Sequence, residues 1–304
     1  IGKQLKTILS ARKKRSIEIL VGRARLAVNA FSENQQCRLC GYCLDGCVYG
    51  SIFNPRAYWH HLDPQGGNYR PNVLVRSFRK DGDAVIVEAK DAETGEPIAF
   101  RANRLFLAAG AVNSTAITAR SLGLTNQRIP LKDAQYFFFP ALLRRKARIP
   151  RADRFTLAEH FVEMKGPASE GRWVHFQVYP HNRIFGATLK NQLGPLGRLK
   201  PLLDFFAGRF VLFQGFLHSD LSPGLSLTAA DDQIRIEGIP NKKSRKTAFW
   251  AALNIQRILK WHAIALIPAL KMVAPGRSFH IGSSFPMKPE ATGFYSDAKG
   301  QPMG

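Results

Sequence analysis

The chain has 304 residues, 45% of them hydrophobic, and its 21 phenylalanines can fill a large core, which excludes wholesale disorder. Its 44 lysines and arginines against 22 acidic residues give a formal net charge of +22, which favours anionic partners: nucleic acid, acidic lipid headgroups or an anionic substrate. The alternative is a globular protein with a solvated basic surface. Because no zinc-finger, RNP or helix-turn-helix pattern accompanies the charge, nucleic acid is not the expected partner.

Basic residues interrupt Ile1–Leu20, so we expect no secretory signal peptide. No uncharged apolar run reaches the length of about 18 residues that a transmembrane helix needs. We therefore expect a cytoplasmic protein, located in the cytosol or at the periphery of a membrane.

All four cysteines lie in one stretch, Cys37-Arg-Leu-Cys40-Gly-Tyr-Cys43-Leu-Asp-Gly-Cys47. The spacing C-x2-C-x2-C-x3-C is typical of a loop that wraps thiolates around an iron–sulfur cluster, although Val48 stands where ferredoxins carry proline. Zinc fits less well, because structural zinc sites usually combine two C-x2-C segments that are separate in the sequence. The third interpretation is a packed loop of small apolar cysteines. The spacing alone does not decide between a metal site and a packed loop.

In chain order, apolar residues of segment 17–24 recur at i, i+3, i+4 and i+7, which predicts an amphipathic helix before the cysteine loop. A short aromatic helix is expected over Arg56–Leu62. Three extended segments then follow, Asn72–Arg76, Ala84–Ala89 and Ile98–Phe100, joined by glycine-containing turns. They predict a small meander of hairpins.

A run of apolar and small residues precedes the next predicted helix. Leu105–Leu107 predicts a strand buried on both faces, and Ala108, Ala109 and Gly110 remove side-chain bulk at its end. Ser114–Ser121 has helical composition. A strand that ends in small residues before a helix N-terminus lets a ligand approach the backbone closely, whereas in other proteins such residues serve packing only.

From about residue 126 the pattern changes to strands without intervening helices, which indicates an antiparallel sheet in a separate domain. The expected strands are Arg154–Leu157, Trp173–Tyr179, Arg209–Leu217, Gly224–Thr228 and Ile234–Glu237. Residues 174, 176 and 178 alternate with their neighbours at a period of two, and the last two strands flank a turn and predict a hairpin. A long helix is expected over Thr247–Leu266. His280 then lies in a glycine- and serine-rich loop, Ser278–Met287.

Three of these stretches resemble the glucose–methanol–choline (GMC) family of flavin oxidoreductases. Cys40–Cys47 looks like the cysteine run of members that oxidise long-chain alcohols and sugars. Leu107–Ser114 is similar to the family's strand-turn-helix near the FAD adenosine, and His280–Met287 resembles the segment that bears the catalytic histidine. Their order and spacing also match. The resemblance covers most of the chain and is loosest across residues 126–250.

The chain departs from the family pattern in two places. It contains no G-x-G-x-x-G loop to hold the FAD pyrophosphate, and it stops before the strand and the second catalytic His or Asn that follow the histidine segment in the family. It also begins with Ile1. We therefore expect the middle and late part of such an enzyme, cut at both ends, inactive by itself and unable to hold FAD tightly.

The resemblance implies an α+β fold in which an incomplete Rossmann-like FAD-binding domain carries an inserted antiparallel-sheet substrate-binding domain. The FAD-binding domain would comprise residues 1–125, with the cysteine-rich loop 37–50, and the return segment 273–304. The substrate-binding domain would comprise residues 126–272.

The implied function is FAD-dependent oxidation of an alcohol or sugar hydroxyl to a carbonyl, with the hydride passing to the flavin and the proton to His280. His280 is the expected catalytic residue; the alternative is a histidine that only braces its loop. The expected cofactor-binding residues are Ala108, Ala109 and Gly110. The expected partners are a small-molecule alcohol or sugar and an electron acceptor or membrane surface.

Two alternatives to this function remain open. One is a flavin dehydrogenase subunit of the same family with an iron–sulfur cluster on Cys37, Cys40, Cys43 and Cys47; we expect instead a loop that binds no metal. The other is a non-catalytic basic module that binds nucleic acid or an anionic membrane.

Overall fold

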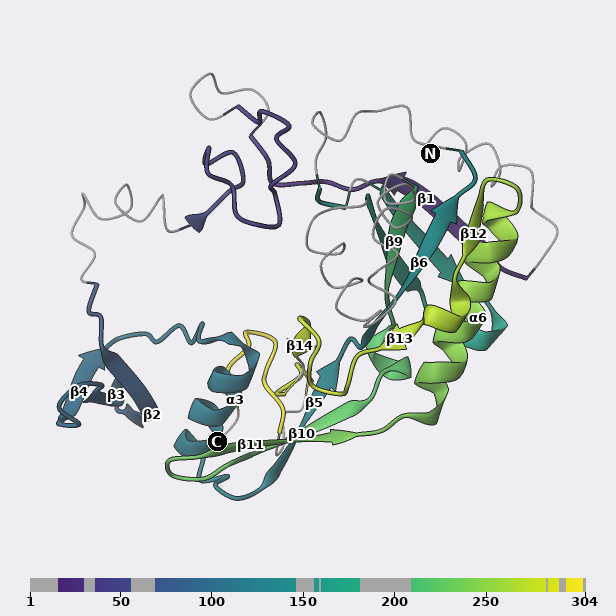
Figure 1. The fold of residues 1–304 in the computed structure, drawn as a ribbon. Helices are drawn as coiled ribbons and strands as arrows, with labels where there is room; N and C mark the ends of the chain where they lie inside the picture. Colours follow the sequence, from purple (N-terminus) through teal and green to yellow (C-terminus); the bar gives the residue numbers. More distant parts are fainter. Residues whose placement is uncertain are drawn as a thin grey trace, which may run out of the picture. The chain divides into compact units, whose positions relative to one another are not determined.

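The computed structural model describes residues 16–29, 36–55, 69–145, 156–158, 160–180, 209–282, 284–289 and 294–302. In these ranges the chain forms three sheets and two α-helices, and every ladder between strands is antiparallel (Figure 1). The mixture of antiparallel sheets and helices confirms the α+β class. Because no parallel sheet occurs within the described residues, the Rossmann-like domain stays a prediction.

The chain divides into two compact units that are described separately. Unit 1 comprises Ile1–His61, Tyr136–Leu221 and Lys242–Val273, and unit 2 comprises Leu62–Gln135, Ser222–Asn241 and Ala274–Gly304. These divisions fall at other residues than the predicted functional domains. The assignment of cofactor and substrate binding to domains therefore stays a prediction.

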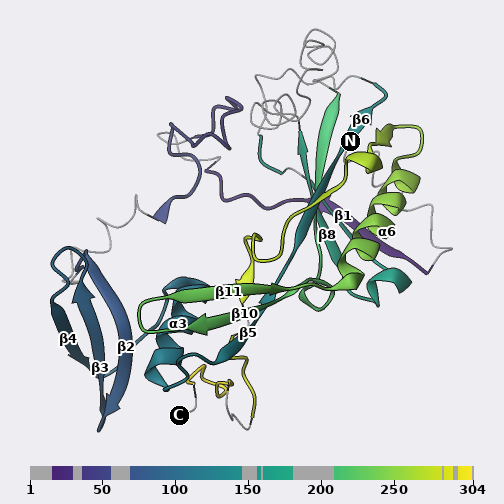
Figure 2. The ribbon, with the colours of Figure 1, turned by 60° about the horizontal axis from the view of Figure 1, so that its bottom comes forward.

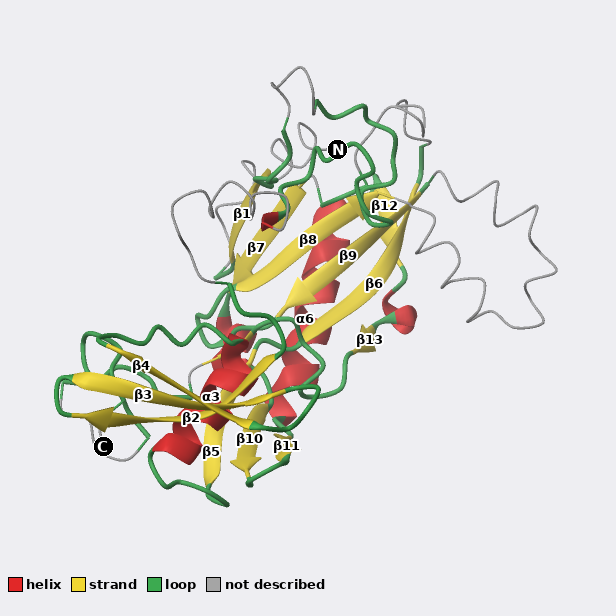
Figure 3. Cartoon of the chain, turned by 90° about the vertical axis from the view of Figure 1, so that its left-hand side faces the viewer, coloured by secondary structure: helices red, strands yellow, loops and turns green. Residues whose placement is uncertain are grey.

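Unit 1 is built on one sheet with the strand order β1-β7-β8-β9-β6-β12, in which β13 also pairs with β6. Its strands are β1 Glu18–Arg23, β6 Tyr136–Leu143, β7 His160–Lys165, β8 Val174–Pro180, β9 Phe210–Phe216, β12 Ala263–Ala265 and β13 Lys271–Met272. Helix α6, Lys242–Leu259, covers one face of this sheet (Figure 3). The predicted strands over 173–179 and 209–217 are confirmed.

A period of two separates the two faces of this sheet. Val174, Phe176 and Val178 of β8 are buried against α6, as the alternation predicted. On the same face the rings of Phe139 and Phe213 stack with centroids 5.3 Å apart. The facing side of α6 carries small residues, Ala248, Ala251 and Ala252, so that the helix approaches the sheet closely. Burying one such phenylalanine stabilises the fold by about 1.5–3 kcal/mol.

One helix prediction in unit 1 is wrong, and a second is confirmed as a helix but with other bounds. Segment 17–24 forms strand β1, because Ile17, Ile19 and Val21 alternate onto the core and β1 pairs with β7 along its length. The long helix begins at Lys242 and ends at Leu259, not at residues 247 and 266; residues 263–265 leave it to pair with β6 as β12. The predicted aromatic helix over 56–62 lies outside the described residues. Of the predicted strand 154–157, the described residues 156 and 157 form a bend.

Unit 2 contains a four-stranded sheet of order β11-β10-β5-β14 and a three-stranded meander β2-β3-β4. Its strands are β2 Val73–Asp81, β3 Ala84–Asp91, β4 Pro97–Ala102, β5 Arg128–Asp133, β10 Gly224–Ala229, β11 Ile234–Ile239 and β14 Ile281–Gly282. Helix α3, Gly110–Ser121, lies against the four-stranded sheet (Figure 2). Ala116 and Ala119 of α3 pack there on Ile129, Leu225 and Leu227. The predicted meander, hairpin and α3 are confirmed.

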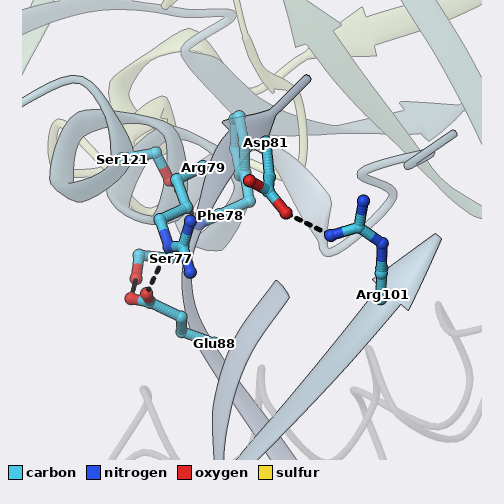
Figure 4. Close-up of polar contacts among 7 residues, drawn as sticks. All are labelled: Ser77, Phe78, Arg79, Asp81, Glu88, Arg101 and Ser121. Atoms are coloured by element: carbon cyan, nitrogen blue, oxygen red, sulfur yellow. Dashed lines mark hydrogen bonds and ion pairs between the residues drawn. The ribbon is translucent and has the colours of Figure 1, made fainter. Parts of the chain in front are cut away.

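The meander is tied to α3 by a hydrogen bond from the backbone of β2 to a side chain of the helix. The N–H of Phe78 in β2 donates to the hydroxyl of Ser121 in the last turn of α3, at 2.8 Å (Figure 4). On the outer side of the meander, Glu88 accepts a hydrogen bond from the Ser77 hydroxyl at 2.7 Å and pairs with Arg79 at 3.4 Å. The meander and the helix are thus fixed within the same unit.

The predicted buried strand at Leu105–Leu107 is wrong. The segment is irregular, and the side chain of Phe106 is 85% exposed. A buried strand needs hydrogen-bonding neighbours for its backbone, and the described residues supply none for this run.

None of the helices in the described part of the chain is both long and apolar enough to cross a membrane.

Candidate functional site

The predicted cofactor-binding residues lie at the N-terminus of α3. Ala108, Ala109 and Gly110 are all exposed, and the first turn of the helix carries no acidic residue. Gly110 has φ +79°, and no atom lies within 4 Å of the place where a Cβ would stand. Helix N-termini present N–H groups without intrahelical partners and attract anionic groups. The turn can therefore accept a ligand directly against its backbone.

The Ala109 N–H is already used, since it donates to the Ser114 hydroxyl at 3.2 Å. This bond holds the turn that leads into α3. It leaves the N–H groups of the following residues as the donors that the turn can offer a ligand.

His280 lies immediately before β14, and its backbone is fixed on both sides. Its carbonyl accepts the N–H of Ala134 at 3.1 Å, and its own N–H donates to the Ser278 hydroxyl at 3.1 Å. The preceding turn is anchored by Asp133, which is 0% exposed and accepts the Gly276 N–H at 3.0 Å. The side chain of His280 is exposed. The loop is held while the imidazole stays accessible.

The structure brings these two stretches together in unit 2, although they are far apart in the sequence. Val112 in the first turn of α3 and Ile281, the neighbour of His280, pack on the same core cluster. In Figure 1, β14 lies close to α3. The exposed imidazole of His280 and the exposed N-terminus of α3 are therefore both attached to the same hydrophobic core.

The cysteine loop belongs to unit 1 and is closed at its base by a short antiparallel bridge. Val28 pairs with Ile52, the N–H of Phe53 donates to the carbonyl of Ala27 at 2.9 Å, and the N–H of Cys37 donates to Asn29 at 3.0 Å. All four cysteines are free and half-buried, and they line one pocket together with Arg38, Tyr49 and Ser51. The sequence predicted the loop but not this shared pocket.

The four thiols do not converge as metal ligands. In the described ranges no group of three or more histidine, cysteine, aspartate or glutamate side chains is placed to hold one metal ion. The arrangement does not fit an iron–sulfur cluster, and we base no step on one. The prediction of a loop that binds no metal stays a prediction.

Cys47 has the most distinctive surroundings of the four. Its sulfur accepts the Ser51 N–H at 3.2 Å. Burial raises the pKa of the Cys47 thiol, but the backbone N–H groups of Ile52, Ser51 and Tyr49 and the adjacent Ser51 hydroxyl outweigh it and lower the pKa below its ordinary value. The loop therefore favours the thiolate at this one position.

A further group of polar and aromatic side chains lies on the face of the unit 1 sheet opposite α6. Glu163, His175, Phe216 and Tyr136 form one cross-strand row through β7, β8, β9 and β6. The His175 Nδ1 lies 3.2 Å from the Glu163 Oε1. The rings of Phe216 and Tyr136 lie 5.9 Å apart. The row combines an acid–imidazole pair with two rings.

The next row on this face contains Phe161, Gln177, Gln214 and Phe138. The Tyr179 hydroxyl donates to the Gln177 side-chain oxygen at 2.6 Å, and burial raises the pKa of Tyr179. The sequence analysis singled out neither His175 nor this face of the sheet. The alternation of Phe161 and Glu163 with buried Val162 and Met164 was the signal that could have revealed it.

Gly22 in β1 accounts for the position of the Phe161 ring. A Cβ at Gly22 would lie 2.5 Å from two ring carbons of Phe161, so only glycine leaves room for the ring there. Held this way, the ring stacks on His175 with centroids 5.9 Å apart.

Comparison of the sequence with protein-family models and with curated proteins gives no match.

Proposed function

We propose that this chain supplies the adenosine-contacting turn, the catalytic histidine and the substrate-binding sheet of a GMC-type oxidoreductase that uses FAD to oxidise an alcohol or sugar hydroxyl. The observation that supports this most is the packing of α3 and β14 on one core. It places two of the three family-like stretches in the same layer, through Val112 and Ile281. In the GMC family both stretches belong to the FAD-binding domain, so the proposal requires the adenosine-contacting turn and the catalytic histidine to lie in the same part of the fold.

The residues at the α3 N-terminus fit contact with FAD in part. Ala108, Ala109 and Gly110 leave their backbone open, and the space beside Gly110 can take a ligand atom. The sequence has no G-x-G-x-x-G, so we assign the pyrophosphate to none of the described residues. When bound, FAD supplies the hydride acceptor of the reaction.

His280 would act as the general base that takes the proton of the substrate hydroxyl. Its backbone bonds to Ala134 and Ser278 fix the loop and leave the imidazole exposed. A base of this kind needs a stable position and access to the substrate oxygen. The backbone bonds support the first requirement, and the exposure of the imidazole is compatible with the second.

We assign substrate recognition to the mixed face of the unit 1 sheet. Aromatic rings such as Phe216 and Tyr136 can lie against the C–H faces of an alcohol or sugar, while Gln177, Gln214 and Glu163 offer hydrogen bonds to its hydroxyl groups. The basic net charge of +22 favours an acidic electron-acceptor protein or an anionic membrane surface as the second partner.

The test uses the natural gene product that contains this chain. We expect it to purify with bound FAD, and anaerobic mixing with a panel of alcohols and sugars to bleach the flavin absorbance. His280→Ala should slow flavin reduction by about 10²–10⁴-fold with FAD still bound. His262→Ala, a change at an exposed histidine of unit 1, should leave the rate unchanged.

Two results would count against the proposal. Reduction of the His280→Ala protein at the wild-type rate would remove His280 from the mechanism. A gene product without flavin that binds nucleic acid or anionic vesicles in a salt-sensitive way would favour the basic binding module instead.

A further inference from the structure

The cysteine pocket holds a buried hydroxyl that the proposed flavin chemistry does not use. Ser51 is 2% exposed and lines the pocket beside Cys47. Its Oγ is close enough to the Cys47 sulfur to lower the thiol pKa, yet within the described residues it meets no partner in hydrogen-bond geometry. Buried polar atoms are normally satisfied. The pocket thus holds a donor that a ligand oxygen could satisfy.

The surroundings of the Cys47 sulfur suit a nucleophile. The sulfur accepts the Ser51 N–H at 3.2 Å, in a turn closed by the bond from the Gly50 N–H to the Cys47 carbonyl at 3.1 Å. The lowered thiol pKa raises the fraction of thiolate, which is the reactive form. The guanidinium of Arg38 lies over the Tyr49 ring at 4.5 Å, and both side chains line the same pocket.

The pocket also contains further thiols. Cys37, Cys40 and Cys43 line it together with Cys47, and all are free and half-buried. A reactive thiol with an accessible second thiol beside it is the arrangement in which an oxidised sulfur is converted to a disulfide. The pocket therefore combines the attacking sulfur, a donor for the attacked oxygen and the groups that complete the reaction.

We propose that Cys47 is a modification site at which a hydroperoxide oxidises this protein, and that another thiol of the pocket then forms a disulfide with it. The hydroperoxide is the external oxidant. The proposal does not depend on the flavin function, because it concerns the loop of unit 1 alone.

In the first step the Cys47 thiolate attacks one peroxide oxygen. The S–O bond forms, the O–O bond breaks, and the leaving oxygen takes a proton and departs as water or an alcohol. The sulfur loses two electrons and becomes a sulfenic acid. The Ser51 hydroxyl donates to the peroxide during this step.

In the second step the sulfur of Cys37, Cys40 or Cys43 attacks the sulfenic sulfur. The S–S bond forms, the S–O bond breaks, and the hydroxyl takes the thiol proton and leaves as water. The net reaction consumes two thiols and one hydroperoxide.

The experiment treats the reduced 304-residue chain with one equivalent of hydrogen peroxide and maps the products by peptide mass spectrometry. We expect a disulfide that includes Cys47. In the variant with Cys37, Cys40 and Cys43 all changed to serine, dimedone should label a sulfenic acid on Cys47. Cys47→Ser should lose most of the peroxide consumption, whereas the matched Cys43→Ser should keep it. Oxidation spread evenly over the four cysteines, or undiminished in Cys47→Ser, would overturn the proposal.

Ser51→Ala provides a second test that keeps Cys47 and its backbone hydrogen bond. At a pH where the thiol is fully ionised, the rate with peroxide should fall by about three- to tenfold, the effect of one lost hydrogen bond. The rate with iodoacetamide, which does not need an oxygen donor, should stay the same. An equal fall in both rates, or none in the peroxide rate, would show that the hydroxyl does not orient the peroxide.

Discussion

The cysteine loop and the His280 loop are held in opposite ways. Around Cys47 the bonds to the sulfur come from residues shortly after it in the sequence, and the loop is closed at its base by the Val28–Ile52 bridge. Around His280 the anchors are Asp133, the last residue of β5, and Ala134, which follows it; both are far away in the chain. A local site depends on its own turn geometry. A non-local site depends on the core that brings its pieces together, and so it is lost when that core is disturbed.

The largest change should come from breaking the core that α3 shares with β14. Leu227 is 0% exposed in that cluster. Leu227→Ala should cost about 2–5 kcal/mol of stability, because it removes packed methyl groups and leaves a cavity. In hydrogen exchange followed by mass spectrometry, peptides over 128–134 and 276–282 should lose protection together. Peptides of the cysteine loop should not change.

Leu253, a leucine of α6 that is 47% exposed, is the matched control. Leu253→Ala should change stability by no more than about 0.5 kcal/mol. Equal loss of protection in the cysteine loop and the His280 loop on Leu227→Ala would show that the two sites are not held independently.

A smaller change should follow from removing one anchor without opening the core. Asp133→Ala leaves the Gly276 N–H without its acceptor, but it also removes Oδ1, which is buried without a hydrogen-bond partner within the described residues. The two effects oppose each other, so the net cost should be about 1 kcal/mol. Exchange at 276–280 should rise while 128–131 stays protected.

Asp133→Asn, which keeps an acceptor oxygen for Gly276, should have a smaller effect. Asp83→Ala, in the exposed turn between β2 and β3, is the control for the loss of one negative charge and should leave exchange at 276–280 unchanged. If Asp133→Ala leaves exchange of the His280 loop at its wild-type rate, the carboxylate does not hold that loop.

The same contrast explains which elements the sequence could predict. The meander β2–β4 and the hairpin β10–β11 are defined by β-branched alternation and by turns next to each other in the chain, and both were predicted. Segment 17–24 fits a helical and a strand period, and only its pairing with β7 decides between them. The residues of segment 17–24 alone cannot reveal that β7 is their partner strand.

Strand β6 could not be predicted because Pro140 stands in its middle. The Pro140 carbonyl accepts the N–H of Leu266, so this edge of Pro140 faces β12 and β13. The N–H that proline lacks would point to the same side, where the short helix Ile267–Ala269 separates β12 from β13. Proline removes no ladder bond where the neighbouring strand is interrupted. The interruption is visible only once the strands are paired.

Of the candidate site, the sequence located the cysteine loop, the turn at 108–110 and His280, because each is a local motif. It did not reveal the Asp133 anchor or the Glu163–His175 row, since these residues meet only across strands. It also did not reveal that Ser51 is buried beside Cys47. Candidate site residues could thus be identified from the sequence where they are contiguous in the chain.

The smallest effect, and the sharpest test of a local site, concerns the pH dependence of cysteine alkylation. Burial raises the pKa of Cys47, and the N–H groups of Ile52, Ser51 and Tyr49 with the Ser51 hydroxyl lower it to a net value below the ordinary one. A lowered folded-state pKa means that the folded loop favours the thiolate. Its contribution to stability is present above the unfolded-state pKa and is lost as the pH falls through the folded-state pKa. The iodoacetamide rate at Cys47 should therefore reach half its maximum at a lower pH in the folded chain than in urea. Leu227→Ala should leave that midpoint unchanged, because the bonds to the sulfur are local to the loop. A midpoint that is the same folded and unfolded, or one that shifts with Leu227→Ala, would contradict the local origin of the thiolate.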